Sequence, residues 1–192
     1  MIPSFGFGDV LPPFVGPDAT GAQQPRSPYA ASPEDMVSAF CVSPERAAIL
    51  RGLFGFRAEL RANGFNHGFQ WIDGSFVENC EAVNGRPPGD VDVVSLLHRP
   101  VAVRDVDRWV QFVHDRQGTL FNAEWAKATF RCDGYFIDLD APSQNVARTC
   151  AYWVNLFSHQ RATFRWKGLV ELPFAVDDAA ALAMIEERQD AW

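Results

Sequence analysis

Phe69-Gln70-Trp71-Ile72-Asp73-Gly74-Ser75, followed after a Pro/Gly-rich loop by Asp90-Val91-Asp92-Val93-Val94, is the stretch that decides the fold. The first segment predicts a strand that runs into a Gly-Ser turn, and the second predicts a strand with two carboxylates two residues apart. Because side chains alternate across a strand, Asp90 and Asp92 point to the same face. Two acids on one face of an apolar strand repel each other and are costly to bury, so the pattern favours a divalent cation between them.

Length and composition fit one globular domain. The chain has 192 residues, of which 47% are hydrophobic and 13% aromatic, and this is enough for a sizeable core. The formal net charge is −7, which disfavours a broad electrostatic contact with long nucleic acid. Of the 17 basic residues only two are lysines, Lys127 and Lys167.

Cysteine usage and the N-terminus predict a cytoplasmic protein. The four cysteines show no C-x-x-C pair and no histidine at zinc spacing, which favours reduced, packed thiols over a disulfide framework. The first residues lack a basic region followed by an apolar run, so no secretory signal is expected. No run of about 18 apolar residues is present, so no membrane-spanning segment is expected.

Helix and strand signals alternate along the chain, which predicts an α/β (α+β) fold with a mixed sheet flanked by helices. Ser32-Pro33 and Ser43-Pro44 each place a capping serine before a proline at the first helical position. The S-x-x-E pattern of Ser75 to Glu78 has the form of a capping box that opens a short helix. Further helices are expected over 104–116, from 122, over 142–160 and over 177–189, and further strands over 135–140 and 168–174.

Residues 1–31 hold many prolines and glycines interleaved with apolar side chains. Polar linkers seldom carry so many aromatics, so this segment predicts an irregular arm packed on the domain formed by residues 32–192. A disordered tail is the alternative.

Three features point to one chemistry. Gly74-Ser75 at a helix N-terminus offers backbone N–H groups and a hydroxyl to a phosphate. Asp90 and Asp92 offer hard oxygen ligands, and Asp138 offers a third carboxylate from a strand expected to lie alongside. Together they are suited to one or two Mg²⁺ (or Mn²⁺) ions that bridge a triphosphate. Asp140 shares the predicted face of Asp138; Asp138 is preferred because Asp140 is close enough to a proline to cap the next helix.

Gly74-Ser75, Asp90-Val91-Asp92 and a later lone Asp138 in an apolar strand resemble the nucleotidyltransferase superfamily typified by DNA polymerase beta. Ile2-Pro3-Ser4-Phe5, Leu11-Pro12-Pro13 and the segment from Trp71 to Glu78 further resemble an uncharacterised, mostly bacterial family of nucleotidyltransferase-like proteins. The resemblance covers roughly residues 1–175.

The resemblance implies a role for each site residue. Gly74 and Ser75 would hold the β- and γ-phosphates. Asp90 and Asp92 would ligate both metals, while Asp138 would ligate the catalytic metal and help to activate the attacking hydroxyl. Lys167, which lies in sequence with Arg161 and Arg165, is a candidate contact to the triphosphate or to an acidic acceptor, and a solvated basic face is the alternative.

The expected function is therefore transfer of a nucleoside monophosphate from an NTP to a hydroxyl on a protein, an RNA end or a small molecule. The resemblance also implies a protein partner in a toxin–antitoxin or phage-defence pair. Each feature has a structural explanation when taken alone: a capping box for Ser75, a turn residue for Asp90. The alternatives are a catalytically inactive nucleotidyltransferase-fold module that serves as a binding protein or antitoxin, and a homo-oligomeric scaffold docked through the aromatic arm.

Overall fold

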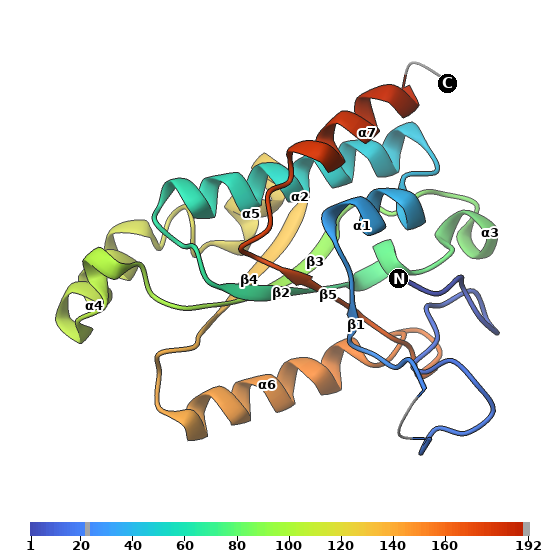
Figure 1. Ribbon diagram of the computed structural model, residues 1–192, viewed down its shortest axis with the longest axis horizontal. Coiled ribbons are helices and arrows are strands. Elements are labelled where there is room, and N and C mark those ends of the chain that lie inside the picture. The colour runs from blue at the N-terminus through green and yellow to red at the C-terminus, as the bar shows by residue number, and fades with distance from the viewer. Residues whose placement is uncertain (22–23, 190–192) are drawn as a thin grey trace.

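A five-stranded mixed sheet with helices on both faces forms the described part of the chain, which confirms the predicted α/β class (Figure 1). The structure is a computed structural model that describes residues 1–21 and 24–189. Residues 22–23 of the predicted arm and 190–192 of the predicted domain therefore lie outside the described residues.

The strands are β1 (Tyr29–Ala30), β2 (Gly68–Asp73), β3 (Val91–Leu97), β4 (Cys132–Asp138) and β5 (Val170–Pro173). The α-helices are α1 (Pro33–Phe40), α2 (Pro44–Ala62), α3 (Cys80–Asn84), α4 (Val106–Arg116), α5 (Ala123–Phe130), α6 (Ser143–Phe157) and α7 (Ala179–Gln189). Two 3₁₀ turns are η1 (Gly74–Val77) and η2 (Val101–Val103).

The strand order is β1-β5-β2-β3-β4. Strand β2 is antiparallel to both of its neighbours, β3 and β5, whereas β4 runs parallel to β3. The register places Asp73 opposite Asp92, and Asp92 opposite Asp133. The short β1, which lies inside the predicted arm, was not expected; it pairs in parallel with β5.

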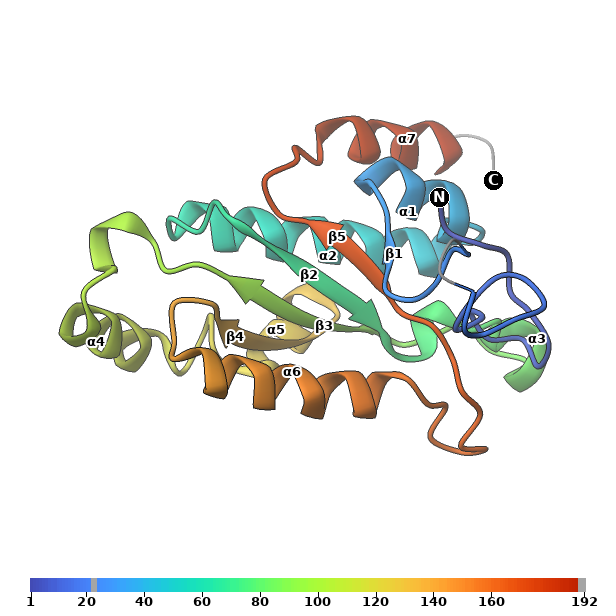
Figure 2. The same ribbon diagram turned by 60° about the horizontal axis from the view of Figure 1, so that its bottom comes forward.

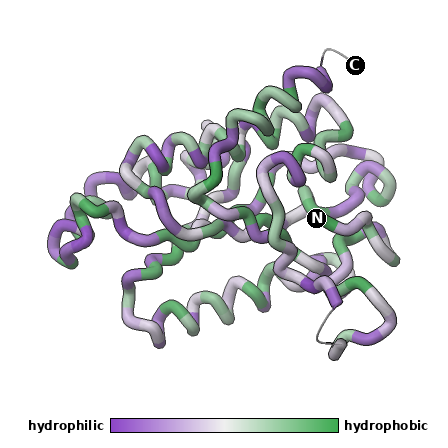
Figure 3. The backbone as a smooth tube through the Cα atoms, in the orientation of Figure 1, coloured by the Kyte–Doolittle hydropathy of each residue, from purple (hydrophilic) through white to green (hydrophobic). Residues whose placement is uncertain are grey.

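Helices α1, α2, α5 and α7 cover one face of the sheet, and α6 covers the other (Figure 2). Strand alternation sends neighbouring side chains to different cores: Ile72 packs with the four-helix side, while Trp71 packs with Trp153 and Phe157 of α6. Apolar and polar residues alternate along α6 (Figure 3), as expected of a helix with only one buried side.

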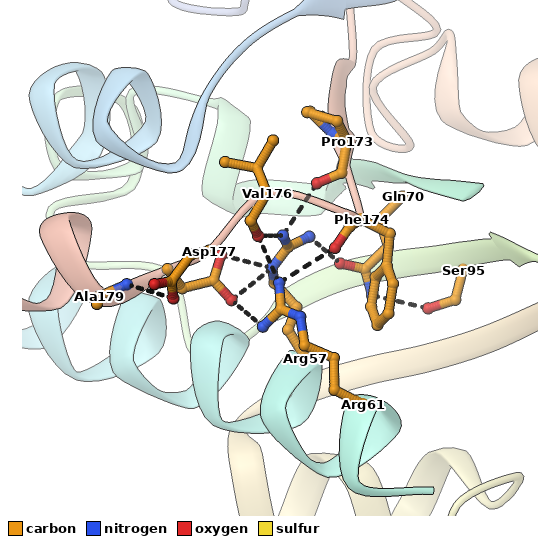
Figure 4. Close-up of polar contacts among 10 residues, drawn as sticks. Arg57, Arg61, Gln70, Ser95, Pro173, Phe174, Val176, Asp177 and Ala179 are labelled. Carbon is orange, nitrogen blue, oxygen red and sulfur yellow. Dashed lines mark hydrogen bonds and ion pairs between the residues drawn. The ribbon is translucent and has the colours of Figure 1, made fainter. Parts of the chain in front are cut away.

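A buried polar chain ties α2 to the sheet and to the start of α7 (Figure 4). The Arg57 guanidinium donates to Asp178 and, at 2.9 Å, to Gln70 Oε1, and Gln70 Nε2 donates to Ser95 Oγ at 2.8 Å. Burial lowers the pKa of Arg57, and the Asp178 carboxylate opposes that shift. Removal of one partner from such a buried ion pair lowers the free energy of unfolding by about 3–5 kcal/mol. This polar network therefore fixes α2 and β2 in place.

The N-terminal arm lies against the end of β5. Val10 and Leu11 are buried, the Tyr29 hydroxyl donates to the Pro12 carbonyl at 2.8 Å, and the Gly168 N–H donates to the Leu11 carbonyl at 2.7 Å. A Cβ on Gly168 would lie 2.4 Å from the Pro12 oxygen, so the arm approaches closely only because this residue is glycine.

All four cysteines lie in the described residues and are free. None of the helices described is both long and apolar enough to cross a bilayer.

Candidate active site

The turn after β2 is shaped by a glycine. Gly74 has φ +80, and a Cβ there would lie 1.8 Å from Asp92 Oδ2. Both the left-handed backbone and this close approach exclude other residues without a shift of the strand. The predicted Gly-Ser turn is therefore present, and it lies directly against the predicted metal ligand Asp92.

The predicted capping box at Ser75 and Glu78 is wrong. The helical segment here is the single 3₁₀ turn η1, which has no side-chain cap, and Glu78 lies just beyond its end. The Glu78 carboxylate instead accepts from Lys167 Nζ at 2.9 Å and from Gln160 Nε2 at 2.8 Å. A buried ammonium is a stronger partner for a carboxylate than a neutral backbone amide.

Lys167 lies beneath this turn, with only 3% of its side chain exposed. Its ammonium donates to the Gly74 carbonyl at 3.0 Å and to Glu78, and it forms an ion pair with Asp73 at 3.2 Å. The lysine predicted to contact nucleotide thus holds the carbonyl of the predicted phosphate-binding glycine. The two arginines near Lys167 in the sequence lie elsewhere. Arg161 is exposed on the cavity, and Arg165 donates to the Gly8 carbonyl of the arm at 2.9 Å.

Arg46 holds the same segment from the other side, and the sequence prediction missed it. Its buried guanidinium donates to the Phe76 carbonyl at 2.7 Å, to the Glu78 carbonyl at 2.6 Å and to Glu81. A signal was present in the sequence, because Arg46 and Arg57 end a helical apolar stripe that contains Leu50 and Leu53. Arginine at both ends of such a stripe indicates buried cations that bind other elements.

Three neighbouring strands bring acids together at one end of the sheet. Asp73, Asp92 and Asp133 are laterally paired across β2, β3 and β4. Laterally paired residues share a face, and Asp90, which directly precedes β3, is near enough for its charge to act on Asp92. Burial raises the pKa of Asp92, and the charges of Asp133 and Asp90 raise it further. The site is therefore a cluster of like charges.

Asp138 does not join this cluster, so the predicted trio of Asp90, Asp92 and Asp138 is corrected. Strand β4 begins at Cys132, three residues earlier than predicted, and runs parallel to β3, so its start meets Asp92. Asp138 lies opposite Leu97 at the far end, and alternation turns it to the other face. Its Oδ2 accepts from Arg99 Nη2 at 2.8 Å and Nε at 2.9 Å.

Asp140, the alternative third ligand, is also remote from the cluster. It contacts His98 Nδ1 at 3.0 Å and accepts from the Arg99 backbone N–H at 2.9 Å. The carboxylate that the structure places beside Asp92 is Asp133. The alternation of Tyr135 and Ile137 extends back to Asp133, and this was the available signal in the sequence. Phe56 and Ala126 lie 3.1 and 3.3 Å from where a Gly134 Cβ would be, which explains the glycine within a strand.

A cavity of about 410 Å³ opens over these residues. Gly74, Ser75 and all four acids line it, and Val83, Leu156 and Phe157 form an apolar part of its wall. Its basic residues are Arg86, Lys127, Arg161 and Lys167, together with His159. Acids that suit a cation, basic groups that suit an anion and an apolar wall thus surround one space.

The donor set fits a hard divalent cation, because Mg²⁺ takes carboxylate oxygens. As the side chains stand, however, the described residues contain no group of three His, Cys, Asp or Glu side chains able to hold a metal ion. Asp90 forms an ion pair with Lys127. The ligand chemistry is present, and one ligand is already occupied by a protein cation.

Buried Asp73 completes the acidic row. Its Oδ1 lies 3.2 Å from Lys167 Nζ and accepts no hydrogen bond of good geometry from the described residues. Burial raises the pKa of Asp73 to about 8, although the Lys167 charge opposes the shift. Asp73 was not among the predicted site residues; its place directly before the Gly-Ser turn was the available signal in the sequence.

One comparison with known proteins gives a match. A family model described as "Family of unknown function (DUF6932)" matches residues 3–173. The searches of curated proteins and of solved structures give no match.

Proposed function

We propose a nucleotidyltransferase activity for this protein, which belongs to the DUF6932 family. The observation that carries the proposal is the placement of Asp90, Asp92 and Asp133 beside the Gly74-Ser75 turn in one cavity. Acids from adjacent strands next to a tight glycine turn are suited to a metal-bound triphosphate. The reaction would transfer a nucleoside monophosphate from an NTP to an acceptor hydroxyl.

Asp90, Asp92 and Asp133 would hold Mg²⁺ or Mn²⁺, with Asp133 in the role first assigned to Asp138. Bound metal would neutralise phosphate charge and orient the α-phosphate. The acceptor oxygen would form a bond to the α-phosphorus while the bond to pyrophosphate breaks, and a carboxylate of the cluster would take the hydroxyl proton.

The Gly74-Ser75 turn would bind the β- and γ-phosphates through its N–H groups and the Ser75 hydroxyl. Lys167 and Arg46 would act indirectly, because they donate hydrogen bonds to the backbone carbonyls of this segment and so hold it in place. Arg161 and Arg86 are exposed on the cavity and are placed to contact the phosphate groups. The apolar wall at Val83, Leu156 and Phe157 would face the base or the acceptor.

The acceptor class and a toxin–antitoxin or phage-defence role with a protein partner are proposed from the resemblance. A cytoplasmic location is proposed from the four free cysteines. The net charge of −7 supports a protein or a small molecule over long nucleic acid as acceptor.

The test is incubation of the protein with each α-labelled NTP and Mg²⁺ or Mn²⁺, with pyrophosphate release and self-labelling as readouts. Wild type should release pyrophosphate, and Asp92→Ala and Asp133→Asn should not, although both should keep the wild-type circular dichroism spectrum. Asp138→Asn is the matched control on the same strand. Absence of release and labelling with all four NTPs would overturn the proposal in favour of the inactive module.

A further inference from the structure

Both lysines of the chain contact acids of the same cavity. Lys167 is buried beneath the Gly74 turn, whereas Lys127 reaches Asp90 from α5 and keeps 55% of its side chain exposed. All other basic residues are arginines. Lysine differs from arginine in being a compact point charge on a flexible stem. It is therefore suited to a position where the positive charge must move.

The Lys127 ammonium lies in the field of every proposed metal ligand. Contact with Asp90 raises the pKa of Lys127, burial opposes that shift, and the charges of Asp133 and Asp92 raise the pKa by smaller amounts. The other cations that act on Asp92 are Arg161 and Lys167. Lys127 is thus one of three positive groups around the cluster, and it is the one in direct contact with Asp90.

We infer that Lys127 is a built-in counter-cation that competes with the divalent metal for Asp90 and withdraws when the metal binds. The inference rests on the proposed function, because it takes Asp90 as a metal ligand. It accounts for two observations together: the Asp90–Lys127 ion pair, and the lack of a ready three-ligand group among the residues described.

Withdrawal of Lys127 needs no change in the core. Its neighbour Ala126 is fully buried and anchors α5 against Gly134 of β4, while the half-exposed lysine stem is free to move into the cavity. Exposed ion pairs are weak, and salt screens them, so the ammonium would be displaced at ordinary metal concentrations.

Metal affinity tests the inference without any turnover. Mn²⁺ binding would be measured by electron paramagnetic resonance in nucleotide-free wild type, Lys127→Gln, Lys127→Arg and Arg86→Gln. Lys127→Gln should bind Mn²⁺ about fivefold more tightly, the size expected when one exposed ion pair is removed, and the gain should shrink at high salt. Lys127→Arg should stay near wild type. Arg86→Gln removes another exposed cavity charge and is the matched control for general charge.

An NMR spectrum that detects only lysine side chains would follow the displacement of Lys127 from Asp90 directly. Protein labelled with ¹³Cε-lysine has two lysine signals, and Lys127→Arg assigns them. Titration with Mg²⁺ should move the Lys127 signal towards that of a solvated lysine, with a smaller change for buried Lys167. Asp92→Ala should abolish both changes.

Three results are distinguishable. Tighter Mn²⁺ binding in Lys127→Gln together with a moving Lys127 signal supports the inference. Asp92-dependent metal binding with unchanged affinity in Lys127→Gln, or with a stationary signal, overturns the inference and leaves the proposed function intact. Absence of divalent binding in both wild type and Lys127→Gln overturns both.

Discussion

The two ends of the β3–β4 pair carry acids in opposite circumstances. At one end Asp92 and Asp133 face each other, and their mutual charge helps to raise the pKa of Asp92. At the other end Asp138 is held by the Arg99 guanidinium, and Asp140 by His98 and the Arg99 backbone. An acid in a strand is therefore informative only once its partners are known: neutralised acids stabilise the fold, and crowded acids indicate a ligand.

The largest expected effect is that of Asp92→Asn on catalysis. Loss of a carboxylate that holds the metal should lower the rate of pyrophosphate release by at least about 10³-fold, while relief of like-charge repulsion should keep the melting temperature at or above that of wild type. Stopped-time assays and thermal unfolding measure the two quantities. A variant with more than a tenth of wild-type activity would contradict the assignment of the crowded end as the site.

Gly74→Ala should have the second-largest effect. The substitution combines a left-handed backbone with a Cβ that would lie 1.8 Å from Asp92 Oδ2, so it should cost more than 2 kcal/mol of unfolding free energy and most of the activity. Gly85→Ala is the matched control, because Gly85 also has positive φ (+63) but no atom within 4 Å of the added Cβ. It should cost about 1 kcal/mol. Equal losses in urea titrations would show that the contact with Asp92 is unimportant.

Asp138→Asn should have the opposite effects to Asp92→Asn: it should lower stability and leave activity nearly unchanged. The carboxylate is 16% exposed and accepts two charged hydrogen bonds from Arg99, so its loss should lower the free energy of unfolding by about 1–3 kcal/mol. Activity should stay within about threefold of wild type, because the residue lies at the far end and on the opposite face. A loss of activity as large as that of Asp92→Asn would restore Asp138 to the site.

The last effect is a slope, the pH dependence of stability that Asp73 causes. Its pKa is raised to about 8 in the folded protein from a usual value near 3.8, so between these values the folded state binds a proton that the unfolded state has lost. This contribution to stability is therefore present at low pH and is lost as pH rises towards 8, by up to about 1.4 kcal/mol per pH unit. Asp73→Asn should flatten this slope in denaturant titrations from pH 5 to 8. Identical slopes would show that Asp73 is ionised throughout.

Local patterns predicted most of the elements and half of the acidic site. Ser-Pro caps start α1 and α2 as expected, because the capping serine and the proline act within one turn. Asp90 and Asp92 reach the same cavity because they lie two residues apart at the start of β3. The capping box failed because Glu78 has a stronger partner in Lys167, 89 positions along the chain, which no local pattern contains.

By itself the sequence determined the α/β class, the glycine turn and the Asp-x-Asp pair, since these follow from backbone geometry over a few residues. The tertiary structure alone decided that Asp133 rather than Asp138 stands beside Asp92, and that Lys127 contacts Asp90. The reason is physical: which residues of β3 and β4 face each other depends on the direction and register of the two strands. Helix packing against the sheet sets both, and so does the close fit of Phe56 and Ala126 on Gly134.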